Sequence, residues 1–196
     1  LVILFNRAKD KSAEIWHGYR LGQSGAVLKL TVDESYEIDK FAHHLELLLN
    51  GLEALYYPMF QNEALDESLK LVVNRLRAGK RKGLIAPKSY FDCLPILHEM
   101  RLIKSDVEAE LMAEAAEISA SGHIRAMQAC RVGMWEYQLE AEIKHEFALQ
   151  GARDVAYNSI VAGGNNACIL HYTENDQRLQ DGELVLIDAG AEYQGY

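Results

Sequence analysis

Asp181-Gly-Glu-Leu-Val-Leu-Ile-Asp-Ala-Gly190 is the stretch of sequence that constrains the fold most. It joins a polar Asp-Gly turn to a continuous apolar run, Leu184-Val-Leu-Ile187, which ends at the carboxylate of Asp188. A short apolar run between turn residues is typical of a buried β-strand. We therefore expect a strand over residues 183–189, which carries Asp188 at its end into a partly dry environment.

The carboxylate of Asp188 needs a partner in such an environment. An isolated buried carboxylate is costly unless a proton, a cation or several hydrogen-bond donors neutralise it. Two interpretations follow from the spacing: a strand-end aspartate bonded to turn amides, or a ligand of a hard metal ion. His171, which follows the apolar pair Ile169-Leu170, is either a packed core histidine or a proton-transfer or substrate-binding group beside that metal.

The rest of the second half is predicted to form helices followed by strands. Ser105 and Glu108 have the spacing of a capping box at the start of a helix. The residues expected on its buried side are Val107, Leu111, Ala115, Ile118, Gly122 and Ile124. A second amphipathic helix is expected over 134–149 and a strand over 157–161. This order favours an α+β arrangement, and we place a domain boundary near Ile103, which gives domains at residues 1–102 and 103–196.

The first half alternates between strand and helix patterns. Strands are expected over 1–6 and 13–18, joined as a hairpin by a polar turn at residues 9–12. A helix capped by Asp33 is expected to run to residue 49, followed by a strand over 54–57 and a helix over 62–78 that Gly79 ends. Alternating strands and helices favour an α/β domain.

Composition narrows the class of function. The 196 residues have a formal net charge of -9, which repels the phosphate backbone of nucleic acids. The one local basic cluster, Arg75 to Lys82, suits the solvated C-terminal turn of a helix. No apolar run approaches the length of roughly 18 residues that a membrane span needs. The 3 cysteines are widely spaced and odd in number, so we expect a reducing, cytoplasmic compartment rather than a disulfide framework.

The two ends of the chain suggest a longer protein. The sequence begins without Met, inside an apolar strand-like run, and Tyr193-Gln-Gly-Tyr196 has the pattern of an interrupted hairpin. We therefore expect the chain to be truncated at both ends.

Several segments together resemble one family of peptidases. The segments in the second half are Ala156-Tyr-Asn-Ser-Ile-Val161, Cys168-Ile-Leu-His-Tyr-Thr-Glu-Asn175 and the opening decapeptide, with His98-Glu-Met-Arg-Leu-Ile-Lys-Ser105 and Gly151-Ala-Arg153 upstream. Glu14-Ile-Trp16 and Leu21-Gly22 extend the similarity into the first half. The chain thereby resembles the aminopeptidase P (Xaa-Pro aminopeptidase) family of pita-bread metallopeptidases, family M24.

The resemblance implies a partial creatinase-like N-terminal α/β domain followed by an incomplete pita-bread α+β catalytic domain. Members release the N-terminal residue from peptides with proline in second position, and they use two divalent metal ions, commonly manganese. By resemblance, Asp188 is a metal-binding aspartate and His171 binds substrate near the scissile bond and assists catalysis. Trp16 and Arg81 match residues that reach a neighbouring subunit's active site and bind substrate, which implies a homo-oligomer. Without the resemblance, Trp16 is equally well a core residue and Arg81 a solvated helix-end charge.

The sequence also departs from the family pattern. The second metal-binding aspartate, a histidine and two glutamates that follow in the family are absent from these 196 residues. We therefore expect the longer protein to be the peptidase and this chain to be inactive by itself. The alternative is a metal-free pita-bread module that serves binding or association. Prolidase and creatinase share the architecture, but the wording around His171 and Asp188 favours aminopeptidase P.

Overall fold

The computed structural model describes all residues from Leu1 to Tyr196, and they form two compact units, Leu1–Leu102 and Ile103–Tyr196. The elements of the N-terminal unit are β1 (Ile3–Asn6), α1 (Lys11–His17), α2 (Gly22–Lys29), β2 (Glu34–Glu37), η1 (Ile38–Lys40), α3 (Phe41–Leu49), β3 (Ala54–Tyr57), α4 (Glu63–Ala78), η2 (Gly79–Lys82), β4 (Ser89–Asp92) and α5 (Leu94–Leu102). The elements of the C-terminal unit are α6 (Asp106–Ala129), α7 (Glu136–Leu149), β5 (Asp154–Val155), β6 (Ile160–Gly163), η3 (Gly164–Cys168), β7 (Val185–Asp188) and β8 (Ala191–Glu192).

The N-terminal unit contains two parallel strand pairs. β1 pairs with β2, and β3 pairs with β4. Parallel neighbours require a crossover connection, and helices provide it: α1 and α2 lie between β1 and β2 in the chain, and α3 precedes the β3–α4–β4 unit. This arrangement confirms the predicted α/β class.

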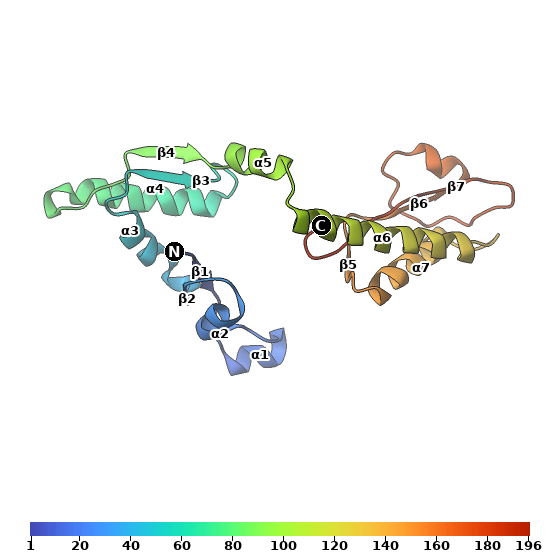
Figure 1. Cartoon of the computed structure of the whole chain (residues 1–196), viewed down its shortest axis with the longest axis horizontal. Coiled ribbons are helices and arrows are strands. Elements are labelled where there is room, and N and C mark those ends of the chain that lie inside the picture. Colours follow the sequence, from blue (N-terminus) through green and yellow to red (C-terminus); the bar gives the residue numbers. More distant parts are fainter. The chain divides into compact units, whose positions relative to one another are not determined.

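Helix α4 carries the core of this unit. It lies along the β3–β4 pair (Figure 1) and buries Leu69, Val72 and Leu76 in a cluster with Leu45 and Leu49 of α3. The helix begins where the sequence predicts, because the Asn62 side chain accepts a hydrogen bond from the backbone N–H of Leu65 at 3.0 Å. Its apolar period therefore determines which face packs.

The predicted hairpin near the N-terminus is wrong. Residues 11–17 form helix α1, because the Asp10 carboxylate accepts hydrogen bonds from the backbone N–H groups of Ser12 and Ala13 and so caps a helix. Asp33 does not cap α3; its carboxylate accepts a hydrogen bond from the Val2 N–H at 2.6 Å. The chain therefore stays extended through β2, which the sequence analysis missed together with β4.

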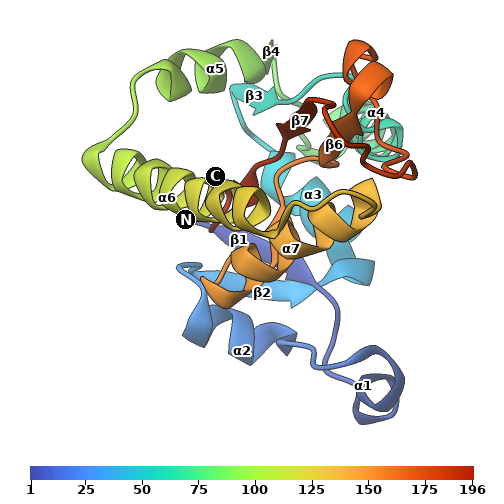
Figure 2. The same cartoon turned by 90° about the vertical axis from the view of Figure 1, so that its right-hand side faces the viewer.

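Two antiparallel helices form one layer of the C-terminal unit. The predicted capping box is confirmed: the Glu108 N–H donates to the Ser105 hydroxyl, and the Glu108 carboxylate accepts from the Ser105 N–H at 2.7 Å. Helices α6 and α7 lie side by side in both Figure 1 and Figure 2. The prediction that Val107 and Ile124 lie on the buried side of α6 is wrong, because these side chains are 65% and 51% exposed. No helix is both long and apolar enough to cross a membrane.

Antiparallel strands follow the helices, which confirms the predicted α+β class. β5 pairs with β8, and β6 pairs with β7. Val161 of β6 is buried in the main core with Leu139, Ile143 and Phe147 of α7, and Ile187 of β7 packs against that core. One face of the β6–β7 pair is thereby fixed against α7, and the other face is left for the site residues.

Candidate active site

Asp188 ends β7, as predicted, but it is exposed. Side chains alternate between the two faces of a strand. Val185 and Ile187 pack against the core, so Leu186 and Asp188 project from the opposite face, where Leu186 keeps 42% exposure. The expectation of a dry carboxylate is therefore wrong for this chain, and burial supplies no argument for a metal at Asp188.

A tyrosine that the sequence analysis did not single out contacts this carboxylate. The Tyr157 hydroxyl donates a hydrogen bond of 2.7 Å to Oδ1 of Asp188. That hydrogen bond, together with burial and the negative charge of Asp188, raises the pKa of Tyr157 above its ordinary value. Tyr157 therefore remains a donor at neutral pH and fixes one carboxylate oxygen, whereas Oδ2 has no hydrogen bond. The only sequence signal was its place in the segment around 156–161.

His171 lies in an exposed turn and forms no hydrogen bond or ion pair. The next residue, Tyr172, is 6% exposed and packs with Ile160 and Ala162 of β6. Ile160 is the register partner of Asp188, and directly opposite residues project from the same sheet face. The loop that carries His171 therefore folds back onto the face that carries Asp188, although no hydrogen bond joins the two side chains.

Glu136, at the first position of α7, is the most extensively bonded side chain near this loop. It is 0% exposed, and its carboxylate accepts hydrogen bonds from the Gly163 N–H, the Asn166 amide, the Tyr172 hydroxyl and the Gln177 N–H. Burial by itself raises the pKa of Glu136, but these four donors outweigh burial and lower that pKa below its ordinary value. Glu136 is therefore a charged group inside the fold.

Asn175 adds a second anchor to the same loop. Its side chain is 2% exposed; it accepts from the Val161 N–H at 3.0 Å and donates to the Ser159 carbonyl at 2.9 Å and to the Glu140 carboxylate at 3.0 Å. Its backbone has a φ of 49°, a left-handed conformation that asparagine tolerates better than most residues. Neither residue is predicted from the sequence as a site residue: Glu136 stands in no recognisable catalytic pattern, and Asn175 ends the characteristic segment of residues 168–175 without a role of its own.

The two remaining predicted site residues belong to the N-terminal unit. Trp16 lies on α1 and is 82% exposed, so the interpretation of Trp16 as a core residue is wrong. Arg81 lies in the turn after α4, is exposed and forms no ion pair. Both side chains are free to contact a ligand or another chain, and their roles stay predictions.

The residues of this chain fit one metal ligand rather than a complete metal site. Asp188 offers a carboxylate with one oxygen free, which suits a hard cation. No group of three or more His, Cys, Asp or Glu side chains that could hold a metal ion is present. A two-metal site requires several protein ligands, so these 196 residues do not form one alone.

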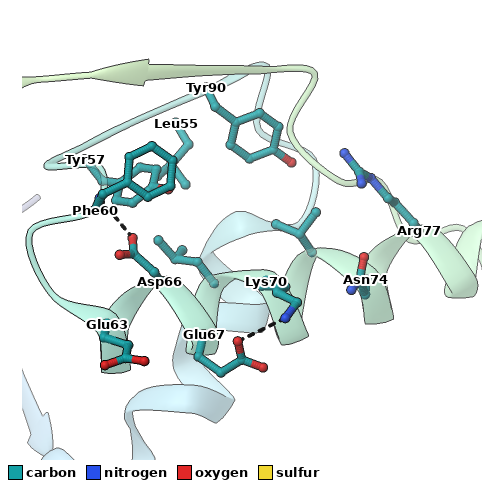
Figure 3. A pocket seen from close by; sticks show the side chains of 12 residues that line it. Leu55, Tyr57, Phe60, Glu63, Asp66, Glu67, Lys70, Asn74, Arg77 and Tyr90 are labelled. Atoms are coloured by element: carbon teal, nitrogen blue, oxygen red, sulfur yellow. Dashed lines mark hydrogen bonds and ion pairs between the residues drawn. The ribbon is translucent and has the colours of Figure 1, made fainter.

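A separate pocket lies between α4 and the β3–β4 pair in the N-terminal unit (Figure 3). Its volume is about 540 Å³. Tyr57 and Tyr90 line it from the strands and Asp66 from the helix, and the Asp66 carboxylate accepts from the Phe60 N–H. Burial and then the charge of Asp66 raise the pKa of Tyr57. None of the predicted site residues lines this pocket.

Two family models match the chain. The model of the aminopeptidase P N-terminal domain matches residues 1–56, and that of metallopeptidase family M24 matches residues 110–196. Xaa-Pro aminopeptidase of Escherichia coli (strain K12) is 49% identical over 194 residues, which are 99% of this chain and 44% of that protein. Human Xaa-Pro aminopeptidase 3 is 31% identical, over 99% of this chain and 38% of its own length.

Solved structures give the same result. Proline aminopeptidase P II from Yersinia pestis superposes with a TM-score of 0.93 at 53% identity, over 98% of this chain and 44% of that one. Zinc-substituted E. coli aminopeptidase P in complex with product has a TM-score of 0.94 at 48% identity, with the same coverage. These matches confirm the resemblance and the fold expected from the sequence. The chain spans less than half the length of these relatives.

Proposed function

We propose that this chain, which combines the aminopeptidase P N-terminal domain with part of a family M24 metallopeptidase domain, provides part of the active site of an Xaa-Pro aminopeptidase. The whole protein would release the N-terminal residue from peptides with proline in second position. The observation that carries this proposal is the identity of 49% along nearly the whole chain with an Xaa-Pro aminopeptidase. A related structure described as a substrate complex supports peptides as the ligands.

The roles of the residues follow from their chemistry. Asp188 would hold a divalent cation through its free oxygen, while Tyr157 fixes the other oxygen and so limits the orientations of the carboxylate. Bound divalent ions supply a nucleophilic water of lowered pKa and polarise the scissile carbonyl. His171, exposed in the loop that packs on the same sheet face through Tyr172, would donate a hydrogen bond to the substrate near that carbonyl.

Three further assignments concern the metal ions, the assembly and the compartment. Two ions fit a family of metallopeptidases, and manganese fits a hard carboxylate ligand. A homo-oligomer is supported by the exposed Trp16, because Trp16 and Arg81 would then contact substrate in a neighbouring subunit. A cytoplasmic location is supported by the free thiols of Cys93, Cys130 and Cys168, which suit a reducing compartment.

An assay of the whole protein tests the proposal. Purified protein should hydrolyse a Gly-Pro peptide with added Mn²⁺ and lose this activity with a chelator. Asp188→Asn should abolish the activity. Asp181→Asn should not, because Asp181 lies in an exposed turn and forms no hydrogen bond. If the whole protein does not hydrolyse Xaa-Pro peptides under any of these conditions, the proposed peptidase activity is refuted and the metal-free association module is favoured.

The 196-residue chain serves as the companion sample. This chain contains Asp188 but no cluster of three metal-binding side chains. We therefore expect that it does not hydrolyse the peptide at any Mn²⁺ concentration. Hydrolysis by this short form would show that the metal ligands lie elsewhere than proposed.

A further inference from the structure

His171 depends on its neighbours for its position. It lies in the segment of residues 164–177, called here the His171 loop, whose only regular element is the short turn η3. His171 forms no hydrogen bond, and Leu170 before it is 84% exposed. The imidazole is therefore placed by the anchors of the loop and not by contacts of its own.

Glu136 connects these anchors. Its Oε1 accepts from the Gly163 N–H at 2.7 Å and from Asn166 Nδ2 at 3.1 Å. Its Oε2 accepts from the Tyr172 hydroxyl at 2.7 Å and from the Gln177 N–H at 2.9 Å. One carboxylate thereby ties the residue before the loop, the residue after His171 and the last residue of the loop to the start of α7.

The charge of Glu136 matters as much as its position. An ionised carboxylate only accepts hydrogen bonds and has lone pairs for four donors, whereas a glutamine of the same shape presents N–H groups at one of its two positions. Each oxygen of Glu136 faces two donors. An amide would therefore set its N–H groups against the Gly163 and Asn166 donors in one orientation and against the Gln177 N–H in the other, so it loses at least one contact whichever way it turns.

The pairing of β6 with β7 links the Glu136 contacts to Asp188. Tyr172, held by Glu136, packs on Ile160, and Ile160 is opposite Asp188. The carboxylate inside the fold thereby sets the position of the His171 loop relative to the sheet face that carries Asp188.

We propose that Glu136 is a positioning residue of the active site, acting through Tyr172 and the His171 loop to hold the imidazole over the Asp188 face. The inference deepens the proposed function and rests on it for the role of His171. The anchoring of the loop can be tested without any catalytic activity.

The first test measures the loop in the 196-residue chain and in the whole protein. Glu136→Gln should speed amide hydrogen exchange in residues 163–177 at least tenfold and shift the NMR signal of the His171 ring, while α6 keeps its exchange rates. Tyr172→Phe, which removes one of the four donors, should have a smaller effect in the same direction. The matched control is Glu142→Gln, also on α7, because Glu142 pairs with Arg125 at 2.7 Å and does not contact the loop.

The second test is a double-mutant cycle in the whole protein. Glu136→Gln should lower kcat for a Gly-Pro peptide about 10–100-fold, the size expected for a misplaced active-site group. In a His171→Ala background the same change should lower kcat less than about twofold, since the group that it positions is gone. Its effect on the melting temperature should be equal in both backgrounds.

The outcomes separate the hypotheses. Equal losses of kcat with and without His171 would show that Glu136 does not act through His171. Unchanged hydrogen exchange in the loop would show that Glu136 does not anchor it. Either result overturns the proposal. A wild-type protein without peptidase activity would contradict the proposed function. The hydrogen exchange of the His171 loop and the NMR signal of the His171 ring would then still test whether Glu136 anchors the loop.

Discussion

Gly122→Ala tests the packing of α6 against α7, on which the C-terminal unit depends. A Cβ at position 122 would lie 2.5 Å from Cε1 and 3.0 Å from Cδ1 of Phe147, and 3.3 Å from Cγ2 of Ile143. Phe147 and Ile143 are 1% and 0% exposed, so neither can swing into solvent to make room. Overpacking of a core costs about 1–3 kcal/mol, and an approach of 2.5 Å to a ring that cannot move belongs in the upper half of that range, about 2–3 kcal/mol. Alanine regains about 1 kcal/mol of helix propensity over glycine. We expect the free energy of unfolding to fall by about 1–2 kcal/mol.

Urea denaturation followed by far-ultraviolet circular dichroism measures this change. The control is Gly25→Ala in α2, where the nearest atom to a new Cβ is 3.6 Å away. This ordinary contact leaves only the gain in helix propensity, so the control should be more stable than the wild type by up to about 1 kcal/mol. If Gly122→Ala is as stable as the wild type, the close approach of the two helices described above is incorrect.

Three further predictions concern pH, capping and metal. Burial and the hydrogen bond to Glu136 raise the pKa of Tyr172 from 10.0 to about 12, so its contribution to stability is complete below pH 10.0 and is lost as the pH rises through about 12. Across this window the wild type should lose about 2–3 kcal/mol more than Tyr172→Phe, and equal losses would contradict the assignment. Ser105→Ala should cost about 1 kcal/mol and speed hydrogen exchange of the first turn of α6; unchanged exchange would mean that the capping box contributes nothing. Neither Mn²⁺ nor a chelator should shift the melting temperature of the 196-residue chain, and a saturable rise with Mn²⁺ would reveal a complete binding site.

Local signals in the sequence were sufficient for the elements that carry their own caps. Asn62 and Gly79 mark the ends of α4, and Ser105 with Glu108 marks the start of α6. Helix α1 was misread because its apolar residues, including Ile15 at 79% exposure and Trp16, resemble a strand. The interaction that decides for a helix is the cap by Asp10. An aspartate in a polar run forms the same hydrogen bond in a hairpin turn, so the sequence does not distinguish the two structures.

In the candidate site, too, some residues have a local signal in the sequence and others do not. Asp188 and His171 are predicted as site residues because they stand in characteristic segments, and their roles stay predictions. Glu136 was missed because a glutamate in the first turn of a helix is ordinarily explained by the helix dipole. Its four partners come from residues 163, 166, 172 and 177, and only the folded loop brings them together. Networks of this kind leave no periodic trace in the sequence.

The exposure of Asp188 follows from the strand that carries it. A continuous apolar run such as Leu184–Ile187 is typical of a strand covered on both faces, yet in this chain Leu184 and Leu186 are 86% and 42% exposed. Asp188 shares the face of Leu186, where Tyr172 covers Ile160 and Ala162 of β6 but leaves the side chains of β7 exposed, so the exposure of Asp188 is a property of that uncovered strand and not of the carboxylate. Burial strengthens the attraction between a carboxylate and a cation. The metal affinity of Asp188 in these 196 residues therefore underestimates its affinity wherever that face is covered, and for this reason the decisive assay requires the whole protein.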